Sequence, residues 1–314
     1  MMGFLDAVTG AVANMTGFLD AVPGAVAQGI IWGIMAIGVY ITFRILDIAD
    51  LTVDGTMATG GATLVVCMTL GIPAGIAMII AFIAGCIAGL ITGLFNTKFG
   101  IPAILSGILM QLILYSVNLR IMSQKANLPL SVEKYHIILS LRNIPLALIV
   151  SGAFTVILIA VLYWFFGTEM GHSLRATGCN MNMARANGIN TDTNKIIGLS
   201  LSNGIVALSG ALLSQYQGFC DVNMGRGAIV IGLAAVIIGE VIFGKIFKNF
   251  ALRLLAAVFG GIIYYIVITF VLRLGLNAND LKMFSALVVA IFLAVPYWKR
   301  KIAEKNTREK KEAA

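Results

Sequence analysis

The chain has 314 residues, of which 59% are hydrophobic and only 11% are charged, and its mean hydropathy is +0.96. A soluble domain carries about 25% charged residues because water must wet its surface, so this composition excludes an ordinary soluble protein and predicts an exterior covered largely by lipid. The net charge of +8 does not indicate nucleic-acid binding, because the basic residues lie between apolar runs and in the C-terminal tail, as membrane proteins place them.

The first 24 residues form a duplicated arm. The segment 3–13 recurs at 17–27, with Pro23 in place of Thr9. Two copies do not make a solenoid, and we expect an arm at the membrane interface. No Lys or Arg precedes Arg44, so the sequence lacks the basic region that begins a cleavable signal peptide.

Residues 25–297 form the predicted membrane domain, an all-α polytopic bundle of about eight to ten transmembrane helices. Five apolar segments approach the roughly 20 residues that cross a bilayer as helix: 25–45, 72–95, 101–122, 144–166 and 252–272. Four are shorter: 55–70, 196–213, 227–243 and 283–296. Short segments interrupted by glycine are typical of broken or re-entrant helices that line a cavity inside the protein.

The basic residues predict the orientation. If nine segments cross and the tail 298–314 is cytoplasmic, 15 Lys and Arg residues lie inside and 7 outside, and the reverse choice violates the positive-inside rule. We therefore expect a multi-pass protein of the bacterial plasma membrane with a cytoplasmic C-terminus. Nine crossings place the N-terminus outside, and one miscounted segment would reverse that side.

Glycine recurs every fourth residue in two segments, at Gly29 and Gly33 and at Gly85, Gly89 and Gly93. This spacing puts the glycines on one helix face and lets another backbone approach closely. The pattern predicts tight helix packing.

Polar residues inside apolar segments are costly in lipid and mark candidate sites. Gln111, Tyr115 and Asn118 stand at i, i+4 and i+7 and therefore share one helical face. Asn203 and Ser214 belong to a small, polar face of a later segment. We interpret both faces either as walls of a solute path or as interhelical hydrogen bonds, which contribute about 0.6 kcal/mol each.

Asp54 and Glu240 are candidate functional acids. In an ion-coupled carrier such carboxylates bind the coupling ion. The alternative for Asp54, which clusters with Asp47 and Asp50, is a solvated or helix-capping acid at the membrane edge. The alternative for Glu240 is a salt bridge to Lys245, at the imperfect spacing of i+5.

Motifs for catalysis, metal binding or nucleotide binding are missing from the sequence. The four cysteines show no metal-ligand spacing, and His136 and His172 lie in polar loops without a nucleophile beside them. Residues 239–246 imitate an ATP-binding loop but end in Ile246, where Ser or Thr must hold magnesium. We expect no enzymatic activity, metal or cofactor in this chain.

The polar segment 167–195 is the most informative part of the sequence. Gly178 and Gly188 can end short helices and Asn180 can cap the next one, which predicts a rigid two-helix elbow outside the membrane. The segment resembles the loop of ABC permeases of the branched-chain amino acid and ribose type, whose pattern runs roughly T-x-x-G-x-x-x-R-A-x-G-x-N-x-x-x-A-x-x-x-G-I. The residues that match in order and spacing are Thr168, Gly171, Arg175, Ala176, Gly178, Asn180, Ala184, Gly188 and Ile189.

Two further stretches, 47–55 and 224–240, are similar to segments of the same family, and the resemblance extends from about residue 28 to residue 296. The pairs Asp54-Gly55 and Gly239-Glu240 look closest to permeases of the tryptophan and tyrosine subgroup. In this family the loop is a coupling helix that docks into a separate ATPase subunit.

The resemblance implies the membrane-spanning subunit of an ATP-driven importer. Its partners would be a second permease copy, a cytoplasmic ABC ATPase dimer that carries ATP and magnesium, and an extracytoplasmic substrate-binding protein. The solute would be small and polar, an amino acid and in this subgroup an aromatic one. An ion-coupled secondary transporter that uses Glu240 and Asp54 remains the alternative, while a polytopic membrane enzyme is disfavoured by the missing catalytic motifs.

Overall fold

The computed structural model describes residues 2–131, 135 and 137–273, together with 283, 286–287, 289–291 and 294, and side chains from Asp20 onward. Half of the predicted segment 283–296, the whole tail 298–314 and His136 lie outside the described residues. In chain order the elements are α1 (Met2–Tyr40), the π-helical turn η1 (Ile41–Ile45), α2 (Val53–Thr69), α3 (Ala74–Thr97), α4 (Ala103–Ile121), β1 (Asn127–Pro129), α5 (Ile144–Phe166), α6 (Glu169–Cys179), α7 (Met181–Ala186), α8 (Thr191–Gln217), β2 (Phe219–Asp221), α9 (Ala228–Phe243) and α10 (Phe250–Arg273).

The described part is a helical bundle, which confirms the predicted all-α, polytopic class. Six helical stretches are long and apolar enough to cross a membrane: Asp20–Ile45, Ala74–Thr97, Ala103–Ile121, Ile144–Phe166, Thr191–Gln217 and Phe250–Leu272. Two predicted short segments correspond to α2, which has 17 residues, and to the shorter apolar helix α9. The third, 196–213, is the middle of α8, which has 27 residues because it begins in the polar elbow.

The predicted arm is not separated from the first membrane helix. Helix α1 runs without a break through Pro23 and past residue 24. A proline inside a helix removes one backbone hydrogen bond, yet the helix continues to Tyr40.

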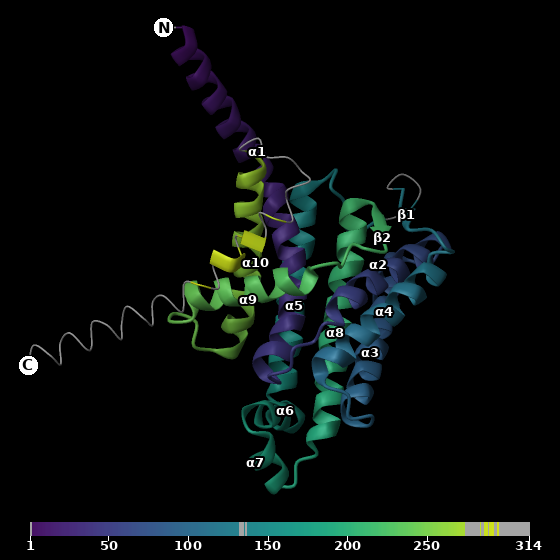
Figure 1. Ribbon diagram of the computed structural model, residues 1–314. Coiled ribbons are helices and arrows are strands. Elements are labelled where there is room, and N and C mark those ends of the chain that lie inside the picture. Colours follow the sequence, from purple (N-terminus) through teal and green to yellow (C-terminus); the bar gives the residue numbers. More distant parts are fainter. Residues whose placement is uncertain are drawn as a thin grey trace, which may run out of the picture.

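Helices α1 and α8 form the inside of the bundle, and α3, α4 and α5 lie outside them (Figure 1). In the most apolar stretches, 78% of α1 and 72% of α8 are buried, against 17% of α5. Ile79 and Ile83 of α3 and Val156 and Trp164 of α5 are more than half exposed. An apolar surface of this kind is suited to lipid, because the bilayer core offers no partner to polar groups.

Spaced glycines let the inner helices approach closely. A Cβ on Gly33 would lie 2.9 Å from the Cα of Val258 in α10. A Cβ on Gly89 would overlap the carbonyl oxygen of Leu199 in α8. Since only a hydrogen atom fits at these crossings, the predicted tight packing is confirmed.

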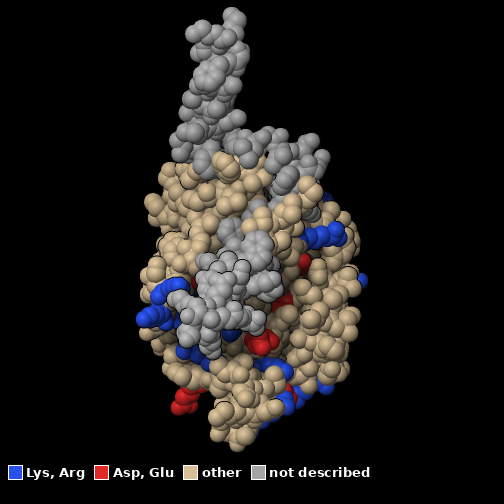
Figure 2. All heavy atoms as spheres, turned by 60° about the vertical axis from the view of Figure 1, so that its left-hand side comes forward, with Lys and Arg blue, Asp and Glu red and all other residues tan. Residues whose placement is uncertain are grey.

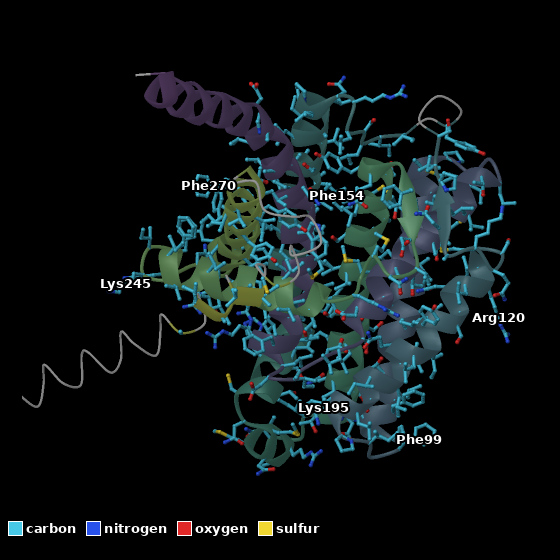
Figure 3. The ribbon with its side chains drawn as sticks, turned by 45° about the horizontal axis from the view of Figure 1, so that its top comes forward. Phe99, Arg120, Phe154, Lys195, Lys245 and Phe270 are labelled. Atoms are coloured by element: carbon cyan, nitrogen blue, oxygen red, sulfur yellow. The ribbon has the colours of Figure 1, made fainter. Side chains whose placement is uncertain are left out.

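The two ends of the bundle differ. At one end, called the sheet end here, β1 and β2 pair antiparallel with Leu128 opposite Cys220. At the other, called the elbow end, α6 and α7 extend beyond the bundle (Figure 1). Figure 3 labels Lys195 and Phe99, which both lie toward the elbow end. The described basic residues of the elbow end are Arg44, Lys98, Arg175, Arg185, Lys195, Lys245, Lys248 and Arg253, and those of the sheet end include Arg120, Lys125 and Arg142.

Candidate functional site: the elbow and the break in the membrane

Local caps build the elbow, residues 168–190. The side-chain oxygens of Thr168, Asn180 and Asn190 each accept a hydrogen bond from the backbone N–H three residues further on, at 3.4, 3.0 and 3.1 Å. These three residues begin α6, α7 and α8. Such oxygens satisfy N–H groups that the first turn of a helix leaves unpaired, so the chain turns twice within a few residues and stays ordered.

Helix α7 ends in a glycine motif. Gly188 has a φ of +79°, its N–H donates to the carbonyl of Arg185, and the N–H of Ile189 donates to the carbonyl of Ala184, both at 3.0 Å. A left-handed glycine with these two bonds is the Schellman motif. The predicted cap at Asn180 and the predicted helix end at Gly188 are confirmed.

Gly178 does not end α6, and that prediction is wrong, because the helix continues through Cys179. The glycine serves a tertiary contact instead. A Cβ on Gly178 would overlap the carbonyl oxygen of Ile45 at the end of η1. A Cβ on Gly171 would overlap the backbone of Phe166 at the end of α5. Both glycines therefore seat α6 directly against the ends of two membrane helices.

Arg175 contacts the end of α5 as well and joins the elbow to the beginning of α10. Its guanidinium carbon lies 4.3 Å from the ring centroid of Phe250 and 5.4 Å from that of Phe166. The two rings are 5.0 Å apart. Cation–π contacts of this kind stabilise by about 0.5–2 kcal/mol, depending on desolvation. Because Phe166 ends α5 and Phe250 begins α10, Arg175 links α6 to both.

The first turn of α8 also holds α6. The side-chain amide of Asn194 donates to the hydroxyl of Ser173 at 2.6 Å and to that of Thr177 at 2.8 Å. Leu174, on the same side of α6, is fully buried. Sequence reasoning missed Asn194, since its partners lie on another helix.

The opposite side of the elbow is exposed. Met183 is 65% and Met170 43% exposed, whereas Ala184 is buried and Ala176 half-buried. Exposed methionines suit protein contacts because the side chain is flexible and polarisable. The elbow therefore has a fixed inner side and an available outer side.

A second polar cluster lies where the chain is not helical, between η1 and α2, at residues 46–52. The Asp50 side chain is buried, and its carboxylate accepts hydrogen bonds from the Asn203 amide at 2.6 Å and from the Thr52 N–H at 2.9 Å. The Asn203 oxygen accepts in turn from the Thr56 hydroxyl at 2.7 Å. A buried carboxyl is costly unless it is hydrogen-bonded, and this network connects the break to α8.

Asp54 caps a distant helix. Its carboxylate accepts from the backbone N–H of Gly227 at 3.0 Å and from that of Ile229 at 2.9 Å, at the beginning of α9. The adjacent turn packs tightly, because a Cβ on Gly225 would overlap the carbonyl oxygen of Asp54. The sequence left Asp54 open as an ion-coupling acid or a helix cap, and in this structure it caps α9.

Glu240 pairs with Arg44, and the expected bridge to Lys245 is wrong. The Arg44 Nε lies 2.8 and 3.0 Å from the two carboxylate oxygens, and Nη2 contacts the same carboxylate. This bidentate geometry is the strong form of such a pair. Lys245 lies beyond the end of α9 at Phe243, in the connection to α10, and Arg44 near the end of η1 reaches the carboxylate instead.

The polar residues of α4 are divided between two sides. Asn118 is buried and its amide donates to the carbonyl of Gly55 in α2 at 3.3 Å. Tyr115 is 41% exposed and Gln111 is half-buried. The buried side of α4 is set by Leu114 and its apolar neighbours, so the structure does not gather the three predicted residues into one lining.

The polar face of α8 is covered by α2. Ser214 donates to the sulfur of Met224 at 3.6 Å and lies against Gly61, while a Cβ on Gly210 would overlap the carbonyl oxygen of Met57. In this structure the face is filled by helix packing. That Asn203 and Ser214 line a solute path stays a prediction.

The described residues contain no group of three His, Cys, Asp or Glu side chains that could hold a metal ion. His172 contacts the carbonyl of Thr168 through Nδ1 at 2.8 Å, within its own helix.

A multi-pass helical bundle with a capped, two-helix elbow at one end is the class that this geometry defines. Residues 23–296 match the family model described as "Branched-chain amino acid transport system / permease component". The chain therefore belongs to this permease family, and the resemblance drawn from the elbow motif is confirmed.

Three relatives show similarity to this chain. A tyrosine transport system permease protein of Clostridioides difficile is 41% identical over 267 residues, 85% of this chain and 88% of the relative. An uncharacterised protein of Rickettsia prowazekii is 36% identical over 85% of this chain and 94% of its own length. An autoinducer 2 import system permease of Escherichia coli is 35% identical over 100 residues, 31% of this chain and 29% of the relative.

A solved structure, PsaBC of Streptococcus pneumoniae in complex with a Fab, has a TM-score of 0.39 and 16% identity, and the similarity covers 82% of this chain and 95% of that one.

Proposed function

We propose that this membrane permease subunit is driven by a separate ABC ATPase that binds the outer side of the elbow. The observation that carries the proposal is the packing of α6 against the ends of the membrane helices. Its inner side contacts η1, α5, α8 and α10 through Gly178, Gly171, Asn194 and Arg175. A force on the exposed side would therefore reach four membrane elements at once. A rigid, two-state coupling of this kind is how a partner can switch a bundle.

In this proposal the elbow end faces the cytoplasm of a bacterial cell and the bundle crosses the plasma membrane. The support is the excess of basic residues at the elbow end, as the positive-inside rule requires. The basic tail 298–314 would lie on the same side. The working assembly would be a permease homodimer with two ATPase subunits, which carry ATP and magnesium, and an extracytoplasmic substrate-binding protein.

The proposed solute is a small polar molecule, an amino acid with an aromatic side chain. Its support is the relative named as a tyrosine transport permease, which is 41% identical. In this structure Asp54 caps α9 and Glu240 pairs with Arg44, which supports the ATP-driven proposal over the ion-coupled alternative.

Docking is tested on the exposed side of the elbow, where a substitution leaves the packing of α6 intact. Met183→Glu should reduce co-purification with the ATPase and solute-stimulated ATP hydrolysis by at least ten-fold, because it places a charge in the proposed interface. The matched control is Leu70→Glu, since Leu70 is 75% exposed at the sheet end. If Met183→Glu binds and stimulates the ATPase as the unaltered chain does, docking at the elbow is wrong.

The side of the elbow is tested with its own cysteine. Cys179 is exposed at the elbow, whereas Cys220 is buried and burial raises the pKa of its thiol to about 12, so that it lacks the reactive thiolate at neutral pH. An impermeant thiol reagent should label Cys179 in inverted vesicles and leave it unlabelled in intact cells. The variant Cys179→Ser serves as the control for labelling elsewhere. Labelling of Cys179 in intact cells would contradict the orientation.

A further inference from the structure

Beside the elbow lies a cavity of about 610 Å³ that the proposed docking does not use. It lies between the end of η1, the end of α5, helix α6 and the connection from α9 to α10. The volume is ample for a polar headgroup or a small ligand.

The cavity is basic. Arg44, Arg175, Lys248 and Arg253 line it, and none of the described residues that line it is Asp or Glu. Glu240 pairs with Arg44 and lines a smaller cavity of about 170 Å³ together with Arg253. Asp47 also acts on Arg44 through its charge, so two carboxylates stand against four cations. Figure 2 shows most of the Lys and Arg side chains of this face in its lower half, below an expanse with few charges. The cavity therefore attracts an anion.

The wall that α5 contributes is apolar and open to the surroundings of the bundle. Tyr163 lines the cavity and is 50% exposed. Its neighbour Trp164 is 72% exposed, and Val156 and Ile149, which share the Tyr163 side of the helix, extend the exposed apolar strip along α5 at 64% and 69%. Tyr and Trp at such a position mark the boundary between headgroups and hydrocarbon. The basic cavity is thus continuous with a surface that suits acyl chains.

We propose that this cavity binds the phosphate headgroup of an anionic phospholipid, whose acyl chains lie along the outer side of α5. Basic pockets between helix ends bind acidic headgroups by charge, and the apolar strip accounts for an amphiphile, because a soluble phosphate would leave it unused. The inference rests on the proposed function only for the leaflet, which would be the cytoplasmic one. A bound headgroup would touch both the elbow and the beginning of α10.

The test measures lipid retention by native mass spectrometry of the purified full-length chain, after exchange into neutral detergent with added phosphatidylglycerol or phosphatidylcholine. The double variant Lys248→Gln/Arg253→Gln should bind phosphatidylglycerol about 25-fold more weakly, since each basic residue near an anionic lipid contributes roughly five-fold. The control is Lys245→Gln, a basic residue of the same connection that does not line the cavity and points outward in Figure 3. Thermal unfolding of each protein shows that it is folded.

Preferential retention of phosphatidylglycerol that the double variant loses and Lys245→Gln keeps supports the site. Equal retention of the two lipids, or unchanged retention in the double variant, overturns it. Inorganic phosphate at 1 mM is the second arm, and stabilisation by phosphate equal to that by phosphatidylglycerol would overturn the lipid assignment in favour of a soluble anion. Since no ATPase is present, failure here leaves the docking proposal untouched, and a failed docking test leaves this one standing.

Discussion

The elbow and the break between η1 and α2 are both short, polar interruptions of an apolar chain, and they are stabilised in opposite ways. In the elbow, Asn180 and Asn190 bond the backbone three residues away. In the break, Asp50 bonds a residue 153 positions away, and Asp54 bonds two residues 173 and 175 positions away. The caps of the elbow are exposed, whereas Asp50 of the break is buried. Local hydrogen bonds suffice in water, whereas a polar break inside the bundle must find partners on other helices.

The largest expected effect concerns Gly178, one of the residues through which the elbow also depends on distant contacts. Gly178→Val should destabilise the bundle by about 3 kcal/mol, because the new side chain overlaps the carbonyl oxygen of Ile45. Thermal unfolding in detergent measures it. The matched control is Gly152→Val, since nothing lies within 4 Å of a Cβ on Gly152. Equal melting temperatures for the two variants would show that α6 is not tightly seated.

The second largest effect is expected for Asp50→Asn, which should lower the free energy of unfolding by about 2 kcal/mol. One of the two donors that face the carboxylate then meets an NH₂ group, and a buried donor without an acceptor costs about 1–3 kcal/mol. Asp47→Asn is the control, because Asp47 belongs to the same break but is exposed. If both variants unfold alike, the network through Asn203 adds nothing to stability.

A pair of cap variants compares the two regions directly. Asn180→Ala and Asp54→Asn should each lower the free energy of unfolding by about 1 kcal/mol, but they should loosen different helices. Hydrogen exchange should rise only in α7 for the first variant and in both α2 and α9 for the second. A rise confined to α2 in Asp54→Asn would mean that the cap on α9 is dispensable.

The smallest effect is expected at the surface of the elbow. Arg185 and Asp192 lie 3.3 Å apart, with side chains that are 54% and 49% exposed. Asp192→Asn should change stability by only about 0.5 kcal/mol, because water screens such pairs. Added salt at 0.5 M should remove even this difference, and a loss above 2 kcal/mol would show that the elbow depends on its surface charges.

The same division explains what could be predicted from the sequence. The limits of α7 follow from Asn180 and Gly188, since each acts within three or four residues of itself, and the apolar helices follow from their length. Three contacts could not be predicted, because each depends on which helices become neighbours. They are the packing of Gly178 against Ile45, the ion pair of Arg44 with Glu240, and the hydrogen bond between Asp50 and Asn203. Asp50 offered one signal, a carboxylate between apolar segments, but the sequence did not separate it from the exposed Asp47.

Helix α8 begins at the Asn190 cap and continues through Gln217 without a kink-forming proline or a break. At 1.5 Å per residue its 27 residues form a rod of about 40 Å, longer than the hydrocarbon layer is thick. One end bonds α6 through Asn194, and the other leads directly into β2. Under the proposed docking, a push at the elbow would therefore be carried along α8 to the strand pair at the sheet end.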